Sequence, residues 1–145
     1  VLSSLRGDTG ICVDLVKGHH NLGISSENGY IVPLDCGATG KTLLAAQSDE
    51  LVERLIQNYP GLEEKLRNQV KEIRQRGYCI SEGEVDEGVA AVAVPLPMPD
   101  HIYTLTYSGP VERLRGLDYM VLVHSLQQAV KNILLKCDGK RKEAL

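Results

Sequence analysis

The sequence contains no tryptophan and no phenylalanine, so tyrosine is its only large aromatic residue. A core made from this chain must therefore be built from aliphatic side chains. No apolar run approaches the roughly 18 residues that a membrane-spanning helix needs, and no stretch resembles a signal peptide. These absences, together with a length of 145 residues and a charged fraction of 24%, are typical of a soluble protein with a single domain.

A basic excess is missing as well. The formal net charge is −3, whereas domains that bind nucleic acids usually carry a surplus of lysine and arginine that neutralises phosphates. Direct DNA binding by these residues is therefore not expected. The locally basic segment at 136–142 favours a solvated helix end over a phosphate contact, because cations stabilise helix C-termini.

No pair of cysteines has the CxxC spacing of a zinc cluster. The cysteines, Cys12, Cys36, Cys79 and Cys137, are interpreted as free thiols of a cytosolic protein. The adjacent His19 and His20 cannot both face one metal ion from a regular strand, so they favour an exposed turn. We predict no metal site, no cofactor and no catalytic residue.

Hydrophobic periodicity predicts strands and then helices in the first half of the chain. Apolar residues alternate over 10–16, and short strand-like segments follow at 22–25 and 30–34, the last with Pro33 at an edge or an end. Three helices are expected next: from Ala38 or Thr39 to Ala46, from Ser48 as N-cap to the Pro60–Gly61 stop, and from Leu62 to Arg76 with Gly77 as C-cap.

The second half of the chain returns to strands. A strand begins at Tyr78, residues 81–88 form an acidic connection, and the continuous apolar run at 89–96 predicts a buried central strand. A strand over 102–107 is expected to end at Ser108-Gly109-Pro110, and a last helix to run over 117–136. This segregation of strands and helices predicts an α+β fold, in which a mostly antiparallel sheet carries helices on its faces.

Residues 35–42 read DCGATGKT and end in Gly-Lys-Thr after a predicted strand, as the phosphate-binding loop of nucleotide hydrolases does. In that motif a glycine stands at the position of Asp35. A carboxylate there repels phosphate, and aspartate lacks the backbone freedom of glycine. A small nucleotide-binding enzyme that uses Gly40-Lys41-Thr42 is therefore kept only as an alternative.

The same turn is suited to presenting main-chain groups to a ligand. Residues 37–40 are small, so a molecule can approach the backbone closely, and the first amides of the following helix lack intrahelical partners. These donors and the helix dipole favour a carboxylate. The alternative is that the small residues only let the helix pack on the sheet.

Three blocks of the sequence resemble IclR-type bacterial transcriptional regulators. They are GATGKTLLA at 37–45, RQRGYCISEGEVDEGVAAVAVPL at 74–96, and Ser108-Gly109-Pro110 followed by Arg113-Leu114. The blocks stand in the family's order and, with the helices between them, cover about residues 30–136. The resemblance implies that residues 1–145 form a single effector-binding domain, the C-terminal domain of such a regulator, with a GAF-like fold. It also implies that the family's N-terminal winged helix-turn-helix is absent from this chain.

The resemblance further implies a set of ligand-binding residues: Ala38, Thr39, Ser81, Glu84, Ala91, Thr106 and Ser108. Thr106 and Ser108 are two positions apart on a predicted strand, so their hydroxyls face the same side. Two hydroxyls and two helix-terminal amides would satisfy the oxygens of a small carboxylate. Glu84 either accepts a hydrogen bond from a ligand hydroxyl or caps the loop.

The chain also departs from the family pattern. Ser81 replaces the usual aspartate, Asp35 stands where a histidine is common, and Thr39 replaces a small apolar residue. Cys36 is interpreted as a packed thiol rather than a redox switch. The acidic residues at 82, 84, 86 and 87 are interpreted as a solvated bend rather than as a pair of catalytic carboxylates.

These observations predict a cytoplasmic sensing domain that binds a small organic acid or related metabolite. The full-length regulator would be a homo-oligomer, dimer or tetramer, and would contact DNA only through its N-terminal domain; ligand binding would control its DNA binding or oligomeric state. The alternative is a GAF-like oligomerisation module without a ligand. The two differ in whether the cavity beside Thr39 and Thr106 is open and polar or plugged by side chains.

Overall fold

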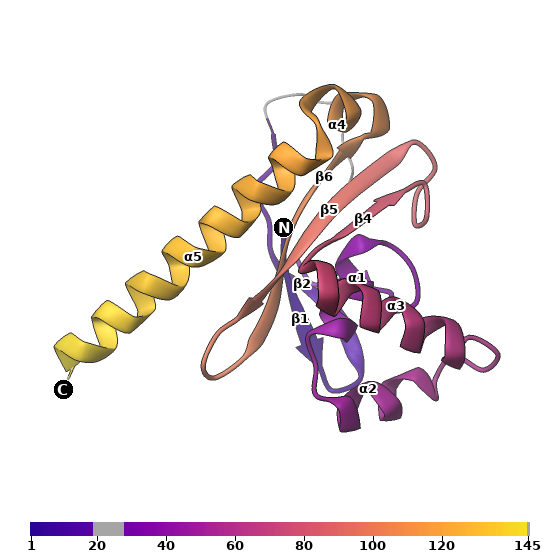
Figure 1. Ribbon diagram of the computed structural model, residues 1–145, viewed down its shortest axis with the longest axis horizontal. Coiled ribbons are helices and arrows are strands. Elements are labelled where there is room, and N and C mark those ends of the chain that lie inside the picture. The colour runs from indigo at the N-terminus through magenta and orange to yellow at the C-terminus, as the bar shows by residue number, and fades with distance from the viewer. Residues whose placement is uncertain (19–27, 145) are drawn as a thin grey trace.

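The computed structural model describes residues 1–18 and 28–144. Within these residues lies a six-stranded sheet, in which every pairing is antiparallel and the strand order is β3-β2-β1-β6-β5-β4 (Figure 1). The strands are β1 (Leu2–Arg6), β2 (Thr9–Asp14), β3 (Ile31–Val32), β4 (Cys79–Glu82), β5 (Val89–Pro97) and β6 (Ile102–Pro110).

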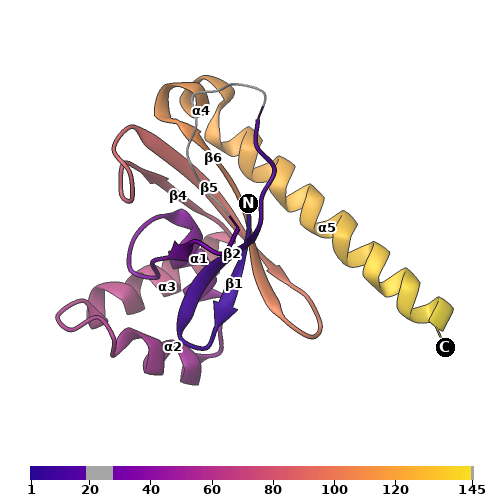
Figure 2. The same ribbon diagram turned by 180° about the vertical axis from the view of Figure 1, so that it is seen from behind.

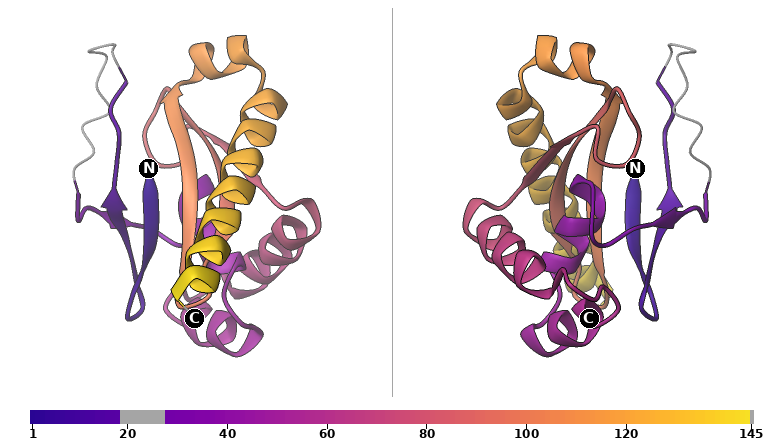
Figure 3. Two further views of the ribbon diagram at one scale, coloured as in Figure 1. Left: turned by 90° about the vertical axis from the view of Figure 1, so that its left-hand side faces the viewer. Right: turned by 90° about the vertical axis from the view of Figure 1, so that its right-hand side faces the viewer.

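Helices cover both faces of the sheet (Figures 1 and 2). One face carries α1 (Ala38–Ala45), α2 (Asp49–Ile56) and α3 (Glu63–Arg76), and the other carries α4 (Val111–Leu117) and α5 (Tyr119–Ala144). The alternation of β5 serves both layers, because Ala91 and Ala93 face the α1 side while Ala90 and Val92 lie in the cluster under α5. Figure 3 shows the β1–β2 hairpin on one side of the molecule, with α3 on the opposite side.

Aliphatic side chains fill both interfaces, as the lack of phenylalanine and tryptophan requires. The larger cluster lies between α1–α3 and the sheet, and its most completely buried large members are Leu34, Leu43, Leu44, Leu55, Ile56 and Leu66. The smaller cluster joins Leu114 of α4 and Val123 of α5 to β5. Truncating a buried leucine of this kind to alanine costs about 2–5 kcal/mol, so these contacts hold α1 firmly against the sheet.

The predicted start of α2 and the predicted end of α3 are confirmed, whereas α2 ends at Ile56, before the predicted stop at Pro60–Gly61. The Ser48 hydroxyl accepts a hydrogen bond from the Leu51 amide at 3.3 Å and so caps α2. Gly77 ends α3 with a φ of 82°, and its amide donates to the Ile73 carbonyl. The predicted edge position of residues 30–34 is also confirmed, since β3 is the outermost strand next to β2.

The prediction that Ser108-Gly109-Pro110 breaks β6 after Tyr107 is wrong, because these three residues belong to the strand, which ends at Pro110. Ser108 lies opposite Ala91, and Gly109 and Pro110 lie opposite the two preceding residues of β5. Pairing with β5 therefore stabilises an extended backbone that local propensity disfavours. β5 itself has a partner on both sides, as expected for a buried strand, but it lies next to the edge strand β4 rather than at the centre.

Two elements have no counterpart in the sequence-based prediction. Residues 2–6 form β1, although Ser3 and Ser4 interrupt any apolar pattern there. The last helical region is divided into α4 and α5 at Asp118, whose φ is 69°. The predicted strand at 22–25 and the pair His19 and His20 lie outside the described residues. None of the described helices combines the length and the apolar character that a membrane span requires.

Candidate functional site

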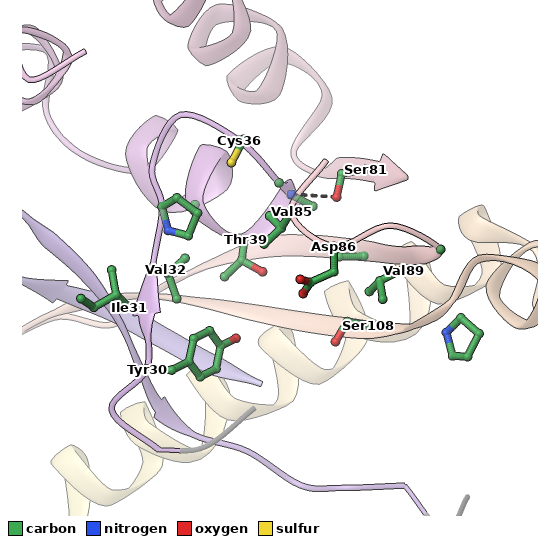
Figure 4. A pocket seen from close by; sticks show the side chains of 17 residues that line it. Tyr30, Ile31, Val32, Cys36, Thr39, Ser81, Val85, Asp86, Val89 and Ser108 are labelled. Carbon is green, nitrogen blue, oxygen red and sulfur yellow. Dashed lines mark hydrogen bonds between the residues drawn. The ribbon is translucent and has the colours of Figure 1, made fainter. Parts of the chain in front are cut away.

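A pocket of about 570 Å³ lies where the start of α1 meets β4, β5 and β6 (Figure 4). The acidic loop at 83–88 and the β3 edge complete its walls. It is lined by Tyr30, Ile31, Val32, Pro33, Cys36, Gly37, Ala38, Thr39, Gly40, Ser81, Val85, Asp86, Gly88, Val89, Ala91, Ser108 and Pro110. Five of the predicted site residues, Ala38, Thr39, Ser81, Ala91 and Ser108, are therefore brought together, while Glu84 and Thr106 are not part of the lining.

The floor of the pocket is a row of small residues across three strands. Ser81 of β4 pairs with Ala91 of β5, and Ala91 pairs with Ser108 of β6. Paired residues of neighbouring strands point to the same face, which here is the α1 side. Because Ala91 ends at its methyl group, the row leaves open space between two hydroxyl-bearing side chains.

The start of α1 forms the opposite wall. The Ala38 amide donates a buried hydrogen bond to the Ser81 hydroxyl at 2.9 Å, so Ser81 caps the helix from a neighbouring strand. The first amide of α1 with a main-chain acceptor at the helix start is that of Lys41, which donates to the Gly37 carbonyl at 3.2 Å. The amides of Thr39 and Gly40 are consequently the first-turn donors that have no intrahelical acceptor.

Two glycines allow α1 to sit so close to its neighbours. Gly37 has a φ of 79°, and a Cβ built there would lie 2.6 Å from Cγ2 of Val85. A Cβ on Gly40 would lie 1.6 Å from the carbonyl oxygen of Pro33, a distance far shorter than any non-bonded contact. The small residues thus serve close packing, as the structural alternative predicted, and they also bring the helix start to the pocket.

Thr106 lies two positions before Ser108 on β6, opposite Ala93, and is not exposed to the cavity. Its hydroxyl shares a hydrogen bond of 2.9 Å with the hydroxyl of Thr39, and its side chain is 5% exposed. Thr106 and Ser108 share a face, as predicted, but only Ser108 reaches the cavity. The Thr106 side chain therefore orients Thr39, which does line the pocket.

Glu84 pairs with Lys41 in this structure. Both carboxylate oxygens accept hydrogen bonds from the lysine ammonium, at 2.8 Å and 3.1 Å, and Lys41 is only 8% exposed. Burying an ammonium group is costly unless a counter-charge accompanies it, and Glu84 supplies that counter-charge. Sequence reasoning missed this contact because the two residues are 43 positions apart.

The same pairing argues against the nucleotide-binding alternative. Lys41 is held by Glu84, and Thr42 is completely buried. In a phosphate loop the corresponding lysine and hydroxyl contact phosphate and magnesium. Neither of these two residues lines the pocket here, so the Gly-Lys-Thr segment functions as the body of a packed helix.

The acidic loop at 83–88 is a solvent-exposed bend, as predicted, and hydrogen bonds make it a compact turn. Its ends are tied by the Gly83 amide, which donates to the Val89 carbonyl at 2.8 Å, and by the Val111 amide, which donates to the Gly88 carbonyl at 2.9 Å. Gly83 and Gly88 have φ values of 65° and 75°, which favour glycine. The turn directs Val85 and Asp86 into the pocket, which sequence reasoning did not predict for Asp86.

Cys36 also lines the pocket. Burial, followed by the negative charges of Asp35 and Glu84, raises the pKa of its thiol above the usual value. The thiol is therefore protonated at neutral pH and weakly nucleophilic, which agrees with a packing role.

The lining offers apolar walls with few polar groups, a combination suited to binding rather than to covalent chemistry. Its polar groups are the hydroxyls, the first-turn amides of α1 and the carboxylate of Asp86. No lysine, arginine or histidine of the described chain lines the cavity. Within residues 1–18 and 28–144, no group of three or more histidine, cysteine, aspartate or glutamate residues is placed to hold a metal ion.

Comparisons with known proteins agree on one family. The model of the C-terminal region of the bacterial transcriptional regulator IclR matches residues 1–135. The chain is 34% identical over 104 residues to a Cupriavidus necator protein named as the transcriptional regulator SauR, which covers 66% of this chain and 41% of that protein. It is 30% identical over 104 residues to the HTH-type transcriptional regulator KdgR of Dickeya chrysanthemi, covering 66% of this chain and 34% of the relative. The chain thus spans less than half the length of these curated relatives.

Solved structures show the same fold. A protein described as an IclR-family transcriptional regulator from Rhodococcus sp. superposes with a TM-score of 0.81 at 25% identity, over 92% of this chain and 55% of the other. An IclR homologue from Microbacterium hydrocarbonoxydans, complexed with 4-hydroxybenzoate, superposes with a TM-score of 0.78 at 20% identity, over 92% and 58%. These likenesses confirm the predicted GAF-like α+β fold.

Proposed function

Because this chain belongs to the IclR family of bacterial transcriptional regulators, as the C-terminal domain that residues 1–135 match, we propose that it binds a small organic acid and so controls a longer regulator. The family predicted from the three sequence blocks is confirmed. The relatives named above are regulators of transcription and not enzymes, in keeping with a domain that binds without catalysis.

The pocket at the start of α1 is the observation that carries the proposal. Its volume of about 570 Å³ is in the range of cavities that hold small molecules. The first-turn amides of Thr39 and Gly40 and the hydroxyl of Ser108 supply uncharged donors, and the helix dipole adds attraction for an anion. An open, partly polar cavity also favours a ligand over the alternative of a module with a plugged pocket.

A structural neighbour supports the ligand class. The Microbacterium hydrocarbonoxydans homologue was solved with 4-hydroxybenzoate, a small aromatic acid. The pocket of this chain combines apolar side chains such as Val32, Val85 and Val89 with polar groups at the helix start. Such a cavity suits an acid with a short apolar body.

The mechanism is a shift of population between arrangements of the regulator. A ligand that touches α1, the 83–88 loop and β6 stabilises whichever arrangement it binds more tightly. β6 leads directly into α4 and α5, so these helices are the elements through which the pocket would reach neighbouring parts of the assembly. We propose a cytoplasmic homo-oligomer, dimer or tetramer, that contacts DNA through an N-terminal domain, with residues 1–145 as its single sensing domain.

Thermal shift assays with a panel of small acids test the proposal. An effector at about 100 times its dissociation constant adds about 2.7 kcal/mol of stability. For a domain of this size that corresponds to a rise in melting temperature of roughly 5–10 °C. If no member of a broad panel of aliphatic, keto, sugar and aromatic acids raises the melting temperature, the sensing function is wrong.

A matched pair of variants tests the position of the site. Ser108→Leu fills the cavity floor and is expected to abolish the ligand-dependent shift. Ser125→Leu makes the same change at an exposed position of α5 and is expected to leave the shift unchanged. A full shift in Ser108→Leu would place the binding site elsewhere.

A further inference from the structure

Among the residues that line the pocket, Asp86 is the one with a charged carboxylate, and no described side chain forms a hydrogen bond or ion pair with it. Figure 4 shows its side chain pointing into the cavity, toward those of Thr39 and Ser108. Among the described residues, no side chain pairs with it. Asp86 therefore differs from its neighbours Glu82 and Glu84, which are both engaged by cationic side chains.

The loop holds Asp86 in this position through its main chain. The Asp86 carbonyl accepts a hydrogen bond from the Val89 amide at 3.2 Å, inside the turn that Gly83 and Gly88 close. Two positions earlier, Glu84 anchors the loop to Lys41 of α1. The carboxylate is thus presented to the cavity by a preorganised turn, and ordering it costs a ligand little free energy.

The other polar groups at the site are partly used within the protein. The hydroxyl of Ser81 accepts from Ala38, and that of Thr39 is shared with Thr106. The groups left for a ligand are the Ser108 hydroxyl, the O–H of Ser81 and the first-turn amides at one side, and the Asp86 carboxylate at another. The first set donates hydrogen bonds, whereas the carboxylate only accepts them.

An anion in this cavity meets no cationic side chain from the described lining, but it does meet one negative charge. Asp86 is exposed, so water weakens the repulsion, but a plain monocarboxylate held beside a like charge still binds at a disadvantage. The disadvantage is reversed when the ligand carries a hydroxyl or ammonium group that donates to Asp86, because hydrogen bonds to a charged acceptor are the strong ones.

We propose that Asp86 is a specificity-determining residue, which makes the pocket select carboxylic acids that carry a hydrogen-bond donor at their other end. The carboxylate of the ligand lies at the start of α1 and Ser108, and its donor lies at Asp86. This inference rests on the proposed function and specifies its ligand class.

Isothermal titration with matched pairs of acids tests it. The pairs are benzoate with 4-hydroxybenzoate, propanoate with 3-hydroxypropanoate, and hexanoate with 6-hydroxyhexanoate, so that chain length and shape vary while the donor is the difference within each pair. For the pair that fits the cavity, the wild-type domain is expected to bind the hydroxylated acid about tenfold or more tightly, which corresponds to about 1.4 kcal/mol. Phenol and 1-hexanol, which carry a donor but no acid, are expected to bind weakly.

Two variants separate the role of Asp86 from general charge effects. Asp86→Ala is expected to reduce the preference to about twofold or less and to strengthen binding of the plain acid, because the repulsion is gone. Glu87→Ala removes the same charge one residue away, from a side chain that is exposed like Asp86 but lies outside the lining, and is expected to keep the preference. Asp86→Asn keeps the shape and an acceptor, so it retains part of the preference for a hydroxyl but loses that for the ammonium of 4-(aminomethyl)benzoate.

The outcomes are distinguishable. An unchanged preference in both folded Asp86 variants, or a wild-type preference for the plain acids, overturns this inference while the sensing function stands. If no acid binds the wild-type domain at all, the proposed function fails and this inference fails with it. Circular dichroism and melting curves of each variant establish that the fold is retained.

Discussion

The two faces of the sheet are covered by helices of very different character. On the pocket face, α1 has eight residues, of which all but Thr39 are buried. On the other face, α5 buries Leu122 and Val123 near its start, whereas Val121 is 58% and Leu135 is 61% exposed. Figures 1 and 2 show the C-terminal half of α5 extending clear of the sheet. The pocket face is thus built to keep one geometry, whereas the α5 face leaves large apolar side chains exposed.

The same contrast holds for two ion pairs of the segment at 82–84, one formed with each face of the sheet. Glu84 binds the buried Lys41 of α1, while Glu82 binds the exposed Arg115 of α4 at 2.6 Å and 2.8 Å and also accepts a hydrogen bond from the Tyr119 hydroxyl of α5. Buried pairs are expensive to break because one charge remains uncompensated, whereas exposed pairs are screened by water. The Glu84–Lys41 pair therefore fixes the pocket wall. The Glu82–Arg115 pair is a weaker interaction, which connects the segment at 82–84 to α4 and α5.

Gly40→Ala is expected to have the largest effect on stability. The new Cβ would overlap the carbonyl oxygen of Pro33, a main-chain atom that cannot move without displacing α1. We expect a loss of about 3 kcal/mol or more in the free energy of unfolding, measured by urea denaturation. Gly139→Ala in α5 is the matched control, since a Cβ there meets nothing within 4 Å. It should be neutral or stabilising by up to about 1 kcal/mol, because alanine favours helix. Equal losses in both variants would contradict the contrast between the two faces.

Glu84→Ala ranks next, because it leaves the ammonium group of Lys41 buried without a counter-charge. The carboxylate side chain is 34% exposed, so the loss is expected to be about 2 kcal/mol, below that of a fully buried pair. The double variant Lys41→Met with Glu84→Ala should recover part of this loss, since no unpaired charge remains. A double-mutant cycle measures the coupling. Additive losses would show that the pair is not coupled.

The exposed pair should be visible in the pH dependence of stability. Hydrogen bonds from Arg115 and then Tyr119 lower the pKa of Glu82 to about 2, from 4.5. Because the folded pKa is depressed, the stabilisation is complete above about pH 4.5 and is lost as the pH falls toward about 2. Compared with the wild-type protein, Glu82→Gln should therefore show a flatter acid limb in a plot of the urea midpoint against pH. An unchanged acid limb would mean that the contacts of Glu82 with Arg115 and Tyr119 do not contribute to the free energy of unfolding.

Leu135→Lys is expected to have the smallest effect on the isolated fold, within about 0.5 kcal/mol, because the side chain is already exposed. If α5 forms the contact between copies of the proposed homo-oligomer, the same change should shift the species seen by size-exclusion chromatography with light scattering toward the monomer. Lys131→Ala, another exposed change on the helix, serves as the control. An unaltered oligomer in Leu135→Lys would assign the contact to another surface.

Elements with strong local signals were predictable from the sequence. Ser48 and Gly77 determine helix ends through hydrogen bonds within a few residues, so the start of α2 and the end of α3 could be placed closely. β6 could not, because its extension through Pro110 depends on pairing with β5 rather than on local propensity. β1 was missed for the same reason, since its serines lie between two strands that supply the pairing.

The candidate site shows the same division. The resemblance to the family indicated Ala38, Thr39, Ser81, Ala91 and Ser108, and the structure brings all five to one cavity, although their contact with a ligand remains a prediction. It did not distinguish the three acids of the 82–86 segment, whose roles depend on which partner each one meets. Glu82 faces Arg115, Glu84 faces Lys41, and Asp86 faces the cavity.

The sequence by itself determined an aliphatic α+β domain, its family, and the small residues through which a helix start can approach a sheet. These properties follow from composition, periodicity and short motifs, which act over a few neighbouring residues. Only the tertiary structure decided that Ser81 caps α1, that Lys41 anchors the acidic loop, and that Asp86 is left to face the pocket. Each of these depends on contacts between segments more than 40 residues apart or on the closure of a turn, and a linear pattern does not encode such distances.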